Sequence, residues 1–413
     1  METFDRAIPK PPALEAILRR ITEGLADELA CPSDIAPDWS GFEWIVARAV
    51  AAMHGVSPLL SRTLRWRGPA GWEKFLEEQR AHTARRHRRI EEMLFLIDRR
   101  TNTAGVAAVA LKGAALHAFG LYQAGDRPMS DIDLLVRPAD AQATSRMLVS
   151  LGYYESCESW KERVFTPIDD HASGELGENS SNNVKIELHE RICERLPLRI
   201  MDVSELVFPP RPRPGLNAYP SKASLMAHLL LHAAGSMAFQ SLRLLHLHDI
   251  AGLSSRMTVE DWDAVLGSSE RVGRLWWAFP PLQLTSRYFP SKVPVRVLEA
   301  LAHDCPYVLE WTSRRRTLYD VSFSHLWVDA FPGIEWSQSI REMLAYAASR
   351  VSPNPKHLAL RKHVAKTEAW VSQSQWPHLS QGRRILRWMT SRPARPLTMH
   401  AVRAALAQAQ CRT

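Results

Sequence analysis

Residues 110–136 read ALKGAALHAFGLYQAGDRPMSDIDLLV, and this stretch decides how the rest of the sequence is interpreted. It places an Asp-x-Asp pair at the start of a short apolar run. Side chains at positions i and i+2 of a strand point to the same face. Asp131 and Asp133 would therefore present two carboxylates together, while Ile132 and Leu134 turn to the opposite, buried face. Adjacent carboxylates repel each other unless a cation lies between them, and Mg²⁺ prefers oxygen ligands. The stretch predicts a metal site on a strand.

A second segment, VKIELHE at 184–190, adds a third carboxylate. Its strict alternation predicts a strand with Lys185, Glu187 and His189 on one face. If this strand lies beside the strand at 131–136, Glu187 completes a cluster of three carboxylates that can hold one or two Mg²⁺ ions. For His189 we expect packing or the orientation of a neighbouring side chain.

A Lys-Gly pair precedes the aspartates, at the point where a short apolar run gives way to a helical segment. Gly113 lets the backbone approach a phosphate closely, and the free N–H groups of a helix start form an anion site. Lys112 would add a positive charge. Arg127 and Ser130, just before the Asp-x-Asp pair, complete the candidate phosphate-binding residues. The alternative for Lys112 and Arg127 is a charge that simply faces water.

The remaining pattern predicts a small strand-rich centre between helical regions. Apolar or alternating runs at 105–111, 131–136 and 184–190 predict strands, and the segment 139–152 predicts a helix that ends at a glycine. Residues 13 to about 100, and the chain from about 215 onward, have helical spacing of their apolar residues.

Together, the segments LKG, DIDLLV, LGY and IELH resemble the polymerase β-like nucleotidyltransferase superfamily, and within it the group called the uncharacterised nucleotidyltransferase family. The resemblance covers about residues 40–290. It implies that Gly113 lies on the phosphate turn, that Asp131 and Asp133 are the metal pair and that Glu187 is the third acid. Two features depart from the superfamily pattern. The turn is Lys-Gly instead of Gly-Gly or Gly-Ser, and the third acid is Glu where Asp is common, which lengthens its reach.

The expected fold is accordingly an α/β (α+β) nucleotidyltransferase core with a small mixed sheet, embedded in mostly helical N- and C-terminal regions. We expect four regions: a helical N-terminal region (1–100), the catalytic core (101–200), a helical region on the acceptor side (201–350) and a basic helical tail (351–413).

The expected reaction is Mg²⁺-dependent (or Mn²⁺-dependent) transfer of a nucleoside monophosphate from an NTP, with ATP as the first candidate, to a hydroxyl or phosphate acceptor. The resembling group implies a peptide natural product or a small molecule as acceptor. Two alternatives stay open. One is an RNA-directed (tRNA) nucleotidyltransferase of the toxin type, and the other is a non-catalytic nucleotide-binding protein.

Charge is distributed unevenly along the chain. The net charge is +8, yet residues 351–413 hold eleven Lys or Arg and one acid, so that the rest of the chain sums to −2. Such a tail could contact RNA, an acidic partner or an anionic substrate. The alternative is a solvated helical face.

Several classes of protein are disfavoured. The five cysteines are widely spread without a CxxC pair, which argues against a disulfide framework or zinc knuckle and for a reducing compartment. The N-terminus has no signal-peptide pattern and no run is long enough to span a bilayer, so we expect a cytoplasmic protein without membrane contact. No P-loop, HExxH or Ser-His-Asp order is present.

In the segment HLHD, His246 and His248 point apart on a helix and cannot share one ion. Arg243 and Asp249 are expected to form a polar face toward the cleft or an intrahelical pair.

Overall fold

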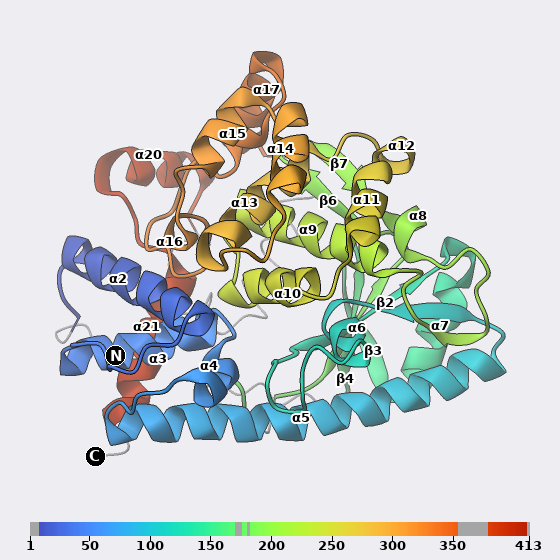
Figure 1. Ribbon diagram of the computed structural model, residues 1–413, viewed down its shortest axis with the longest axis horizontal. Coiled ribbons are helices and arrows are strands. Elements are labelled where there is room, and N and C mark those ends of the chain that lie inside the picture. Colours follow the sequence, from blue (N-terminus) through green and yellow to red (C-terminus); the bar gives the residue numbers. More distant parts are fainter. Residues whose placement is uncertain (1–7, 170–175, 180–181, 354–378, 411–413) are drawn as a thin grey trace.

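The three predicted strands become neighbours in one six-stranded mixed sheet. In the computed structural model, which describes residues 8–169, 176–179, 182–353 and 379–410, the strand order is β3-β4-β5-β2-β1-β8 (Figure 1). Strand β2 pairs antiparallel with β1 and parallel with β5, and β1 pairs parallel with β8. The predicted small mixed sheet with helical flanks is confirmed. The strands are β1 (Ala107–Ala110), β2 (Asp131–Val136), β3 (Tyr153–Glu158), β4 (Arg163–Pro167), β5 (Lys185–His189), β6 (Cys193–Leu196), β7 (Arg199–Asp202) and β8 (Gly215–Asn217).

Five of these strands are absent from the pattern read in the sequence. The pair β3 and β4 extends the sheet beyond β5, β8 forms the opposite edge, and β6 with β7 makes a separate two-stranded sheet. Strand β3 reads YYESCE and is mostly exposed, and β8 has only three residues. Short edge strands of this kind carry little apolar periodicity, so their positions depend on tertiary pairing.

The two faces of β2 serve different purposes. Ile132, Leu134 and Val136 lie in a core that the sheet shares with helices α5 (Ala70–Thr103) and α7 (Pro138–Ser150). Leu135 lies in the larger helical core on the other side of the sheet. Because side chains alternate along a strand, the aspartates of β2 share this second side, as the sequence predicts.

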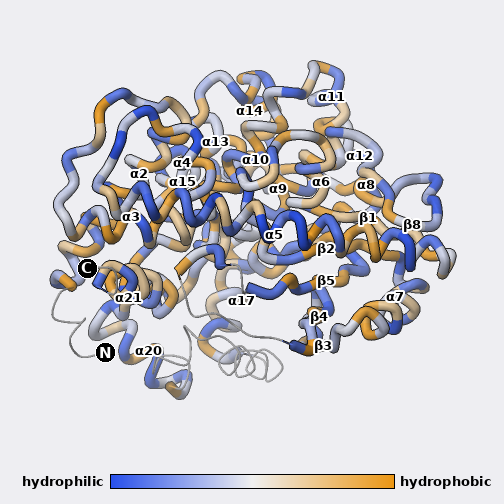
Figure 2. Tube along the Cα trace, turned by 90° about the horizontal axis from the view of Figure 1, so that it is seen from below, coloured by the Kyte–Doolittle hydropathy of each residue, from blue (hydrophilic) through white to orange (hydrophobic). Residues whose placement is uncertain are grey.

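Helix α5 connects the two cores. Its 34 residues span about 50 Å at 1.5 Å per residue. The first turns bury Trp72 and Phe75 in the helical core, and the later turns bury Ile90 and Ile97 against the sheet. Hydrophilic positions are frequent along the rest of this helix (Figure 2). One continuous element thereby holds the sheet and the N-terminal helices together.

The remaining helices form layers around the sheet and beside it. Helices α2, α3 and α4 build the N-terminal layer, which also receives the C-terminal helix α21 through its contact with α3 (Figure 1). Helix α9 contacts strand β6 and helix α6, and α10 packs against α9. The helices are α2 (Pro11–Ala30), α3 (Gly41–Met53), α4 (Ser57–Thr63), α6 (Lys112–Ala118), α8 (Ser204–Val207), α9 (Lys222–Ala238), α10 (Leu244–Ser254), α11 (Val259–Gly267), α12 (Ser269–Val272), η1 (Trp276–Ala278), α13 (Phe279–Tyr288), α14 (Val295–Asp304), α15 (Tyr307–Ser313), α16 (Leu318–Val321), η2 (Ile334–Trp336), α17 (Ile340–Val351), α20 (Gln381–Ser391) and α21 (Pro396–Gln410).

The basic tail is described only in part, because residues 354–378 and 411–413 of the predicted region 351–413 lie outside the described residues. The division of the chain into four regions stays a prediction. Within the described part of the chain, no helix by itself has the length and apolar character needed to cross a membrane, although the bent pair α3 and α4 reaches both together.

Candidate active site

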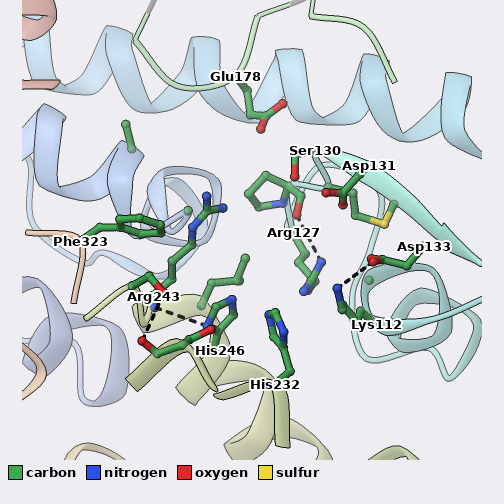
Figure 3. A pocket seen from close by; sticks show the side chains of 18 of the residues that line it. Lys112, Arg127, Ser130, Asp131, Asp133, Glu178, His232, Arg243, His246 and Phe323 are labelled. Carbon is green, nitrogen blue, oxygen red and sulfur yellow. Dashed lines mark hydrogen bonds and ion pairs between the residues drawn. The ribbon is translucent and has the colours of Figure 1, made fainter. Parts of the chain in front are cut away.

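A cavity of about 340 Å³ lies between the sheet, helix α6 and helices α9 and α10 (Figure 3). Pockets of this size are typical of small-molecule sites. All seven candidate residues read from the sequence line it, although they come from several elements: Lys112, Gly113, Arg127, Ser130, Asp131, Asp133 and Glu187.

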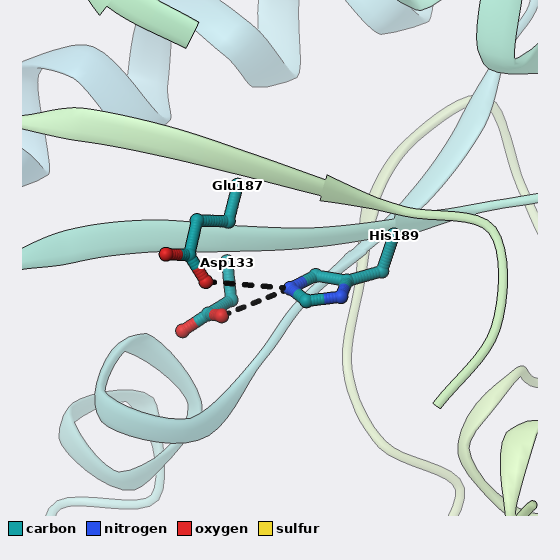
Figure 4. Close-up of side chains that lie close together, drawn as sticks. All are labelled: Asp133, Glu187 and His189. Carbon is teal, nitrogen blue, oxygen red and sulfur yellow. Dashed lines mark hydrogen bonds and ion pairs between the residues drawn. The ribbon is translucent and has the colours of Figure 1, made fainter. Parts of the chain in front are cut away.

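The acidic residues meet because β2 and β5 are parallel neighbours in a defined register. Asp133 lies directly opposite Glu187 in the strand pairing, so the third carboxylate stands beside the Asp-x-Asp pair. Oδ1 of Asp133 accepts a hydrogen bond from Nζ of Lys112 at 2.7 Å (Figure 3). It accepts a second from Nε2 of His189 at 3.0 Å (Figure 4). The expectation that His189 orients a neighbour corresponds to this contact.

Electrostatics distinguish the three carboxyl groups. Burial would raise the pKa of Asp133, but the charge of Lys112 and the hydrogen bond from His189 outweigh it and hold that pKa well below its usual value. Burial and the neighbouring aspartates raise the pKa of Glu187 well above its usual value. Burial and the charge of Asp133 likewise raise the pKa of Asp131. A cation bound here would relieve the repulsion.

The oxygen-rich donor set fits a divalent metal ion. Ligand atoms of Asp133, Glu187 and His189 lie within 4.8 Å of one another, and this is the cluster of metal-binding type found among the described residues. Asp131 lies outside that group but lines the same cavity. Because Mg²⁺ and Mn²⁺ favour carboxylate ligands, and because His189 already hydrogen-bonds Asp133, the imidazole suits the orientation of a ligand better than direct binding.

Lys112 adopts an unusual backbone conformation. Its φ angle is +45°, in the left-handed region that glycine enters freely and that costs other residues of order 1 kcal/mol. A glycine would adopt this conformation without that cost. Burial opposes the charge of Lys112, yet Asp133 and Glu187 raise the pKa of its ammonium group above the usual value. Lys112 thus combines a strained backbone conformation with an ion pair to Asp133.

Gly113 is required by the close approach of neighbouring side chains. A Cβ atom at this position would lie 2.5 Å from Nη1 of Arg127 and 2.7 Å from Cγ of Met129. The turn therefore packs directly on the Arg127 side chain. Any larger residue at position 113 must displace that guanidinium.

Arg127 is neither solvated nor free to move. Its Nε and Nη2 donate to the two carboxylate oxygens of Asp249, at 2.9 and 2.8 Å, and Nη1 donates to the carbonyl of Pro128. Tyr122 donates its hydroxyl to Asp249 as well. Asp249 and Arg243 were expected to form a polar face toward the cleft or an intrahelical pair. The partner of Asp249 is Arg127, from the loop before β2, so the intrahelical pair does not form. Burial disfavours the charge, but Asp249 raises the pKa of Arg127 above its usual value.

Arg86, near the middle of α5, holds the chain just before both acidic strands. Its Nη2 donates to the carbonyl of Ser130, which precedes β2, at 2.5 Å, and to the carbonyl of Asn183, close before β5, at 2.6 Å. The side chain is 5% exposed. One buried guanidinium thus bridges the entrances of the two strands that carry the acids.

Several cavity residues escaped the sequence analysis. Lys161, Glu178, His232 and His246 line the cavity, and so does Arg243, which had been expected on the cleft side of its helix. Lys161 pairs with Glu194 and Glu178 lies 3.6 Å from Arg86. One signal was present in the sequence, since His228 and His232 interrupt an apolar helix at positions i and i+4. Histidines on one helical face in a buried segment indicate a polar site.

One comparison with known proteins gave a match. A family model described as "Uncharacterised nucleotidyltransferase" matches residues 40–290, which is more than half of the chain and includes the acidic cluster. Neither the curated proteins nor the solved structures contain a match.

Proposed function

The chain belongs to the uncharacterised nucleotidyltransferase family, and we propose that it transfers a nucleoside monophosphate from an NTP, with ATP as the donor, to a hydroxyl or phosphate group of an acceptor. The observation that carries this proposal is the pairing of β2 with β5, which stands Glu187 beside Asp133 at the same cavity wall as Lys112. Clustered carboxylates next to a phosphate turn are what metal-assisted phosphoryl chemistry needs.

We assign Asp131, Asp133 and Glu187 to the binding of Mg²⁺, with Mn²⁺ as a substitute. When bound, the metal would neutralise charge on the triphosphate and on the departing pyrophosphate. His189 would keep Asp133 in position through its Nε2 hydrogen bond. Burial and the neighbouring carboxylates raise the pKa values of Asp131 and Glu187, and a bound cation would relieve the part that comes from charge repulsion.

The triphosphate would lie against the turn at the start of α6. The ammonium of Lys112 has three N–H donors, of which one is used by Asp133, and the others are available to phosphate oxygens. The space beside the Cα of Gly113 is filled by Arg127 and Met129. Ser130 lines the same cavity, and its hydroxyl hydrogen-bonds Asp131. Arg127 would act through its positive charge from a fixed place, since Asp249 occupies two of its nitrogen atoms.

In the reaction, the acceptor oxygen forms a bond to the α-phosphorus while the bond from that phosphorus to the bridging oxygen breaks, and pyrophosphate leaves. Where Asp131 and Asp133 alone hold the metal, the free carboxylate of Glu187 takes the proton of a hydroxyl acceptor. A phosphate acceptor attacks as the anion and needs no base. We propose a peptide or a small molecule as acceptor, because helices α9 and α10 enclose the cavity on the side away from the sheet.

The test is transfer of label from each of four NTPs carrying a radioactive α-phosphate, with Mg²⁺ and a cell extract as the pool of acceptors. We expect label in the peptide or small-molecule fraction, and none with the Asp133→Asn variant. The matched control is Asp34→Asn, which changes a carboxylate that is 83% exposed and far from the cavity lining. Label in RNA would instead identify the RNA-directed alternative. If no fraction contains label, the alternative of a non-catalytic nucleotide-binding protein is favoured.

A further inference from the structure

Two arginines line the cavity, and they differ in what neutralises them. Arg127 is matched by Asp249 in a two-pronged ion pair. Arg243, which caps the N-terminus of α10, forms no ion pair within the described residues. The carboxylates whose charges reach it are Asp131 and Glu178, and Glu178 is turned to Arg86. A cation that lines a pocket without a counterion is available to a ligand.

The pKa values of the two guanidinium groups express the same difference. Burial is the largest influence on both. For Arg127, the charge of Asp249 reverses that influence and raises the pKa. For Arg243, no neighbour compensates fully, and burial lowers the pKa. An anion bound beside Arg243 would supply the missing compensation.

Arg243 is nevertheless held in place without a carboxylate. Its guanidinium carbon lies 5.2 Å from the centre of the Phe323 ring, a cation–π distance. In Figure 3 the side chain extends into the cavity from the wall opposite Lys112 and Asp133, with Arg127 between the two ends. The guanidinium is therefore held in place at the end of the cavity away from Lys112 and Asp133, within reach of the charge of Asp131.

Besides the carboxylates of Asp131 and Glu178, the surroundings of Arg243 include donors of hydrogen bonds. Burial lowers the pKa values of His232 and His246 well below the usual value, so both rings are neutral. Nδ1 of His246 faces the backbone N–H of Arg243, which places the ring proton on Nε2. Ser236 and Ser241 also line this end of the cavity. A guanidinium, an imidazole N–H and hydroxyl groups together suit a phosphate or carboxylate.

We propose that the Arg243 end of the cavity is an anion subsite that binds a phosphate or carboxylate group of the acceptor. The inference rests on the proposed function in one respect, namely that the triphosphate occupies the Lys112 end. It narrows the acceptor to an anionic molecule that presents its attacking oxygen toward Glu187 while its anionic group contacts Arg243. The other source of the same chemistry is the terminal phosphate of the NTP, and the experiment separates the two.

The experiment is calorimetric titration of inorganic phosphate into the full chain, first loaded with Mg²⁺ and a nucleotide whose α–β bridging oxygen is replaced by methylene. Wild type is compared with Arg243→Gln, with Arg243→Lys and with Arg341→Gln, a matched change at an exposed arginine of α17. Thermal melting of each variant verifies folding. Acetate is titrated in parallel as the carboxylate probe.

We expect phosphate to bind the nucleotide-loaded wild type and the Arg341→Gln control equally. Arg243→Gln should weaken phosphate binding by about tenfold or more, since a charge-assisted contact is lost. Arg243→Lys should fall between, because a point charge replaces a planar fork. The dissociation constant of the nucleotide should stay unchanged in both variants.

Three results would overturn the proposal. Phosphate could fail to bind the nucleotide-loaded wild type, or it could bind Arg243→Gln as tightly as wild type. Phosphate could also compete with the nucleotide while Arg243→Gln binds the nucleotide more weakly than wild type. The last would assign Arg243 to the triphosphate. Failure of the proposed function looks different, because nucleotide would then bind wild type and Asp133→Asn alike and without dependence on Mg²⁺.

Discussion

The ion pair between Arg127 and Asp249 allows a quantitative test of how the site is supported. The side chains are 9% and 2% exposed, and two hydrogen bonds of 2.9 and 2.8 Å join them. Replacing Asp249 by Asn keeps the shape but removes the charge, which leaves the guanidinium buried without a counterion. Losing one partner of a buried pair costs about 3–5 kcal/mol. We expect the Asp249→Asn variant to lose that much free energy of unfolding.

The assay is urea-induced unfolding followed by tryptophan fluorescence and by circular dichroism. Removing both charges, with Asp249→Asn and Arg127→Met together, should restore part of the loss, because no orphaned cation remains. The control is Asp263→Asn, which breaks an ion pair with Arg296 whose side chains are 57% and 44% exposed. Exposed pairs contribute only about 0–1 kcal/mol.

A loss of less than about 1 kcal/mol in Asp249→Asn would refute the reasoning, since a buried, unpaired guanidinium cannot be that inexpensive. A double variant that loses as much free energy of unfolding as Asp249→Asn, or more, would refute it too. Either result would mean that water reaches Arg127 in the folded protein. The turn at Gly113, which packs on the same guanidinium, would then also be looser than described.

Four further outcomes can be checked on the same protein. Lys112→Met should lower the rate of nucleotidyl transfer about tenfold to a hundredfold, measured as label transferred, because a charge-assisted phosphate contact is lost; an unchanged rate would remove Lys112 from the site. Gly113→Ala should cost about 1–3 kcal/mol in urea unfolding, because its Cβ would lie 2.5 Å from Nη1 of Arg127; full stability would contradict the crowding. Mg²⁺ should raise the melting temperature of wild type but not of Asp133→Asn, and an equal rise in both would place the ion elsewhere. Burial lowers the pKa of His54 from 6.5 to about 3, so the unfolded chain takes up this proton before the folded protein does. The free energy of unfolding should therefore fall as the pH drops from 6.5 toward 3, by up to about 1.4 kcal/mol per pH unit from this residue. A flat profile over that range in urea unfolding would show that the imidazole is protonated in the folded protein.

The acidic wall of the cavity could be read from the sequence because its geometry is local. Alternation along two strands is enough to place Asp131 with Asp133 and Glu187 with His189 on common faces. The one long-range step, that the strands at 131–136 and 185–189 are neighbours, followed from the resemblance to a known family and is confirmed by their pairing.

The opposite wall could not be read in this way. The partner of Arg127 is Asp249, 122 residues further along the chain. That Arg243 has no ion pair among the described residues depends on the folded packing alone. The helical position of Arg243 predicts that its side chain faces the cleft, but it does not identify the side chains that surround it. The edge strands β3 and β8 were not predicted for a related reason. Their sequences are short runs that become extended only because they pair with the sheet.

The bridge made by Arg86 has a consequence for how this protein can vary. The chain leaves β4 at Pro167 and enters β5 near Asn183, where Arg86 holds the backbone that it also ties to Ser130. The position of Glu187 relative to Asp133 is thus anchored at the entrance of the strand and does not depend on the path of the connection before it. Changes of length between 168 and 182 that leave the cavity-lining residues Gly177 and Glu178 in place should therefore be tolerated without moving the acids apart.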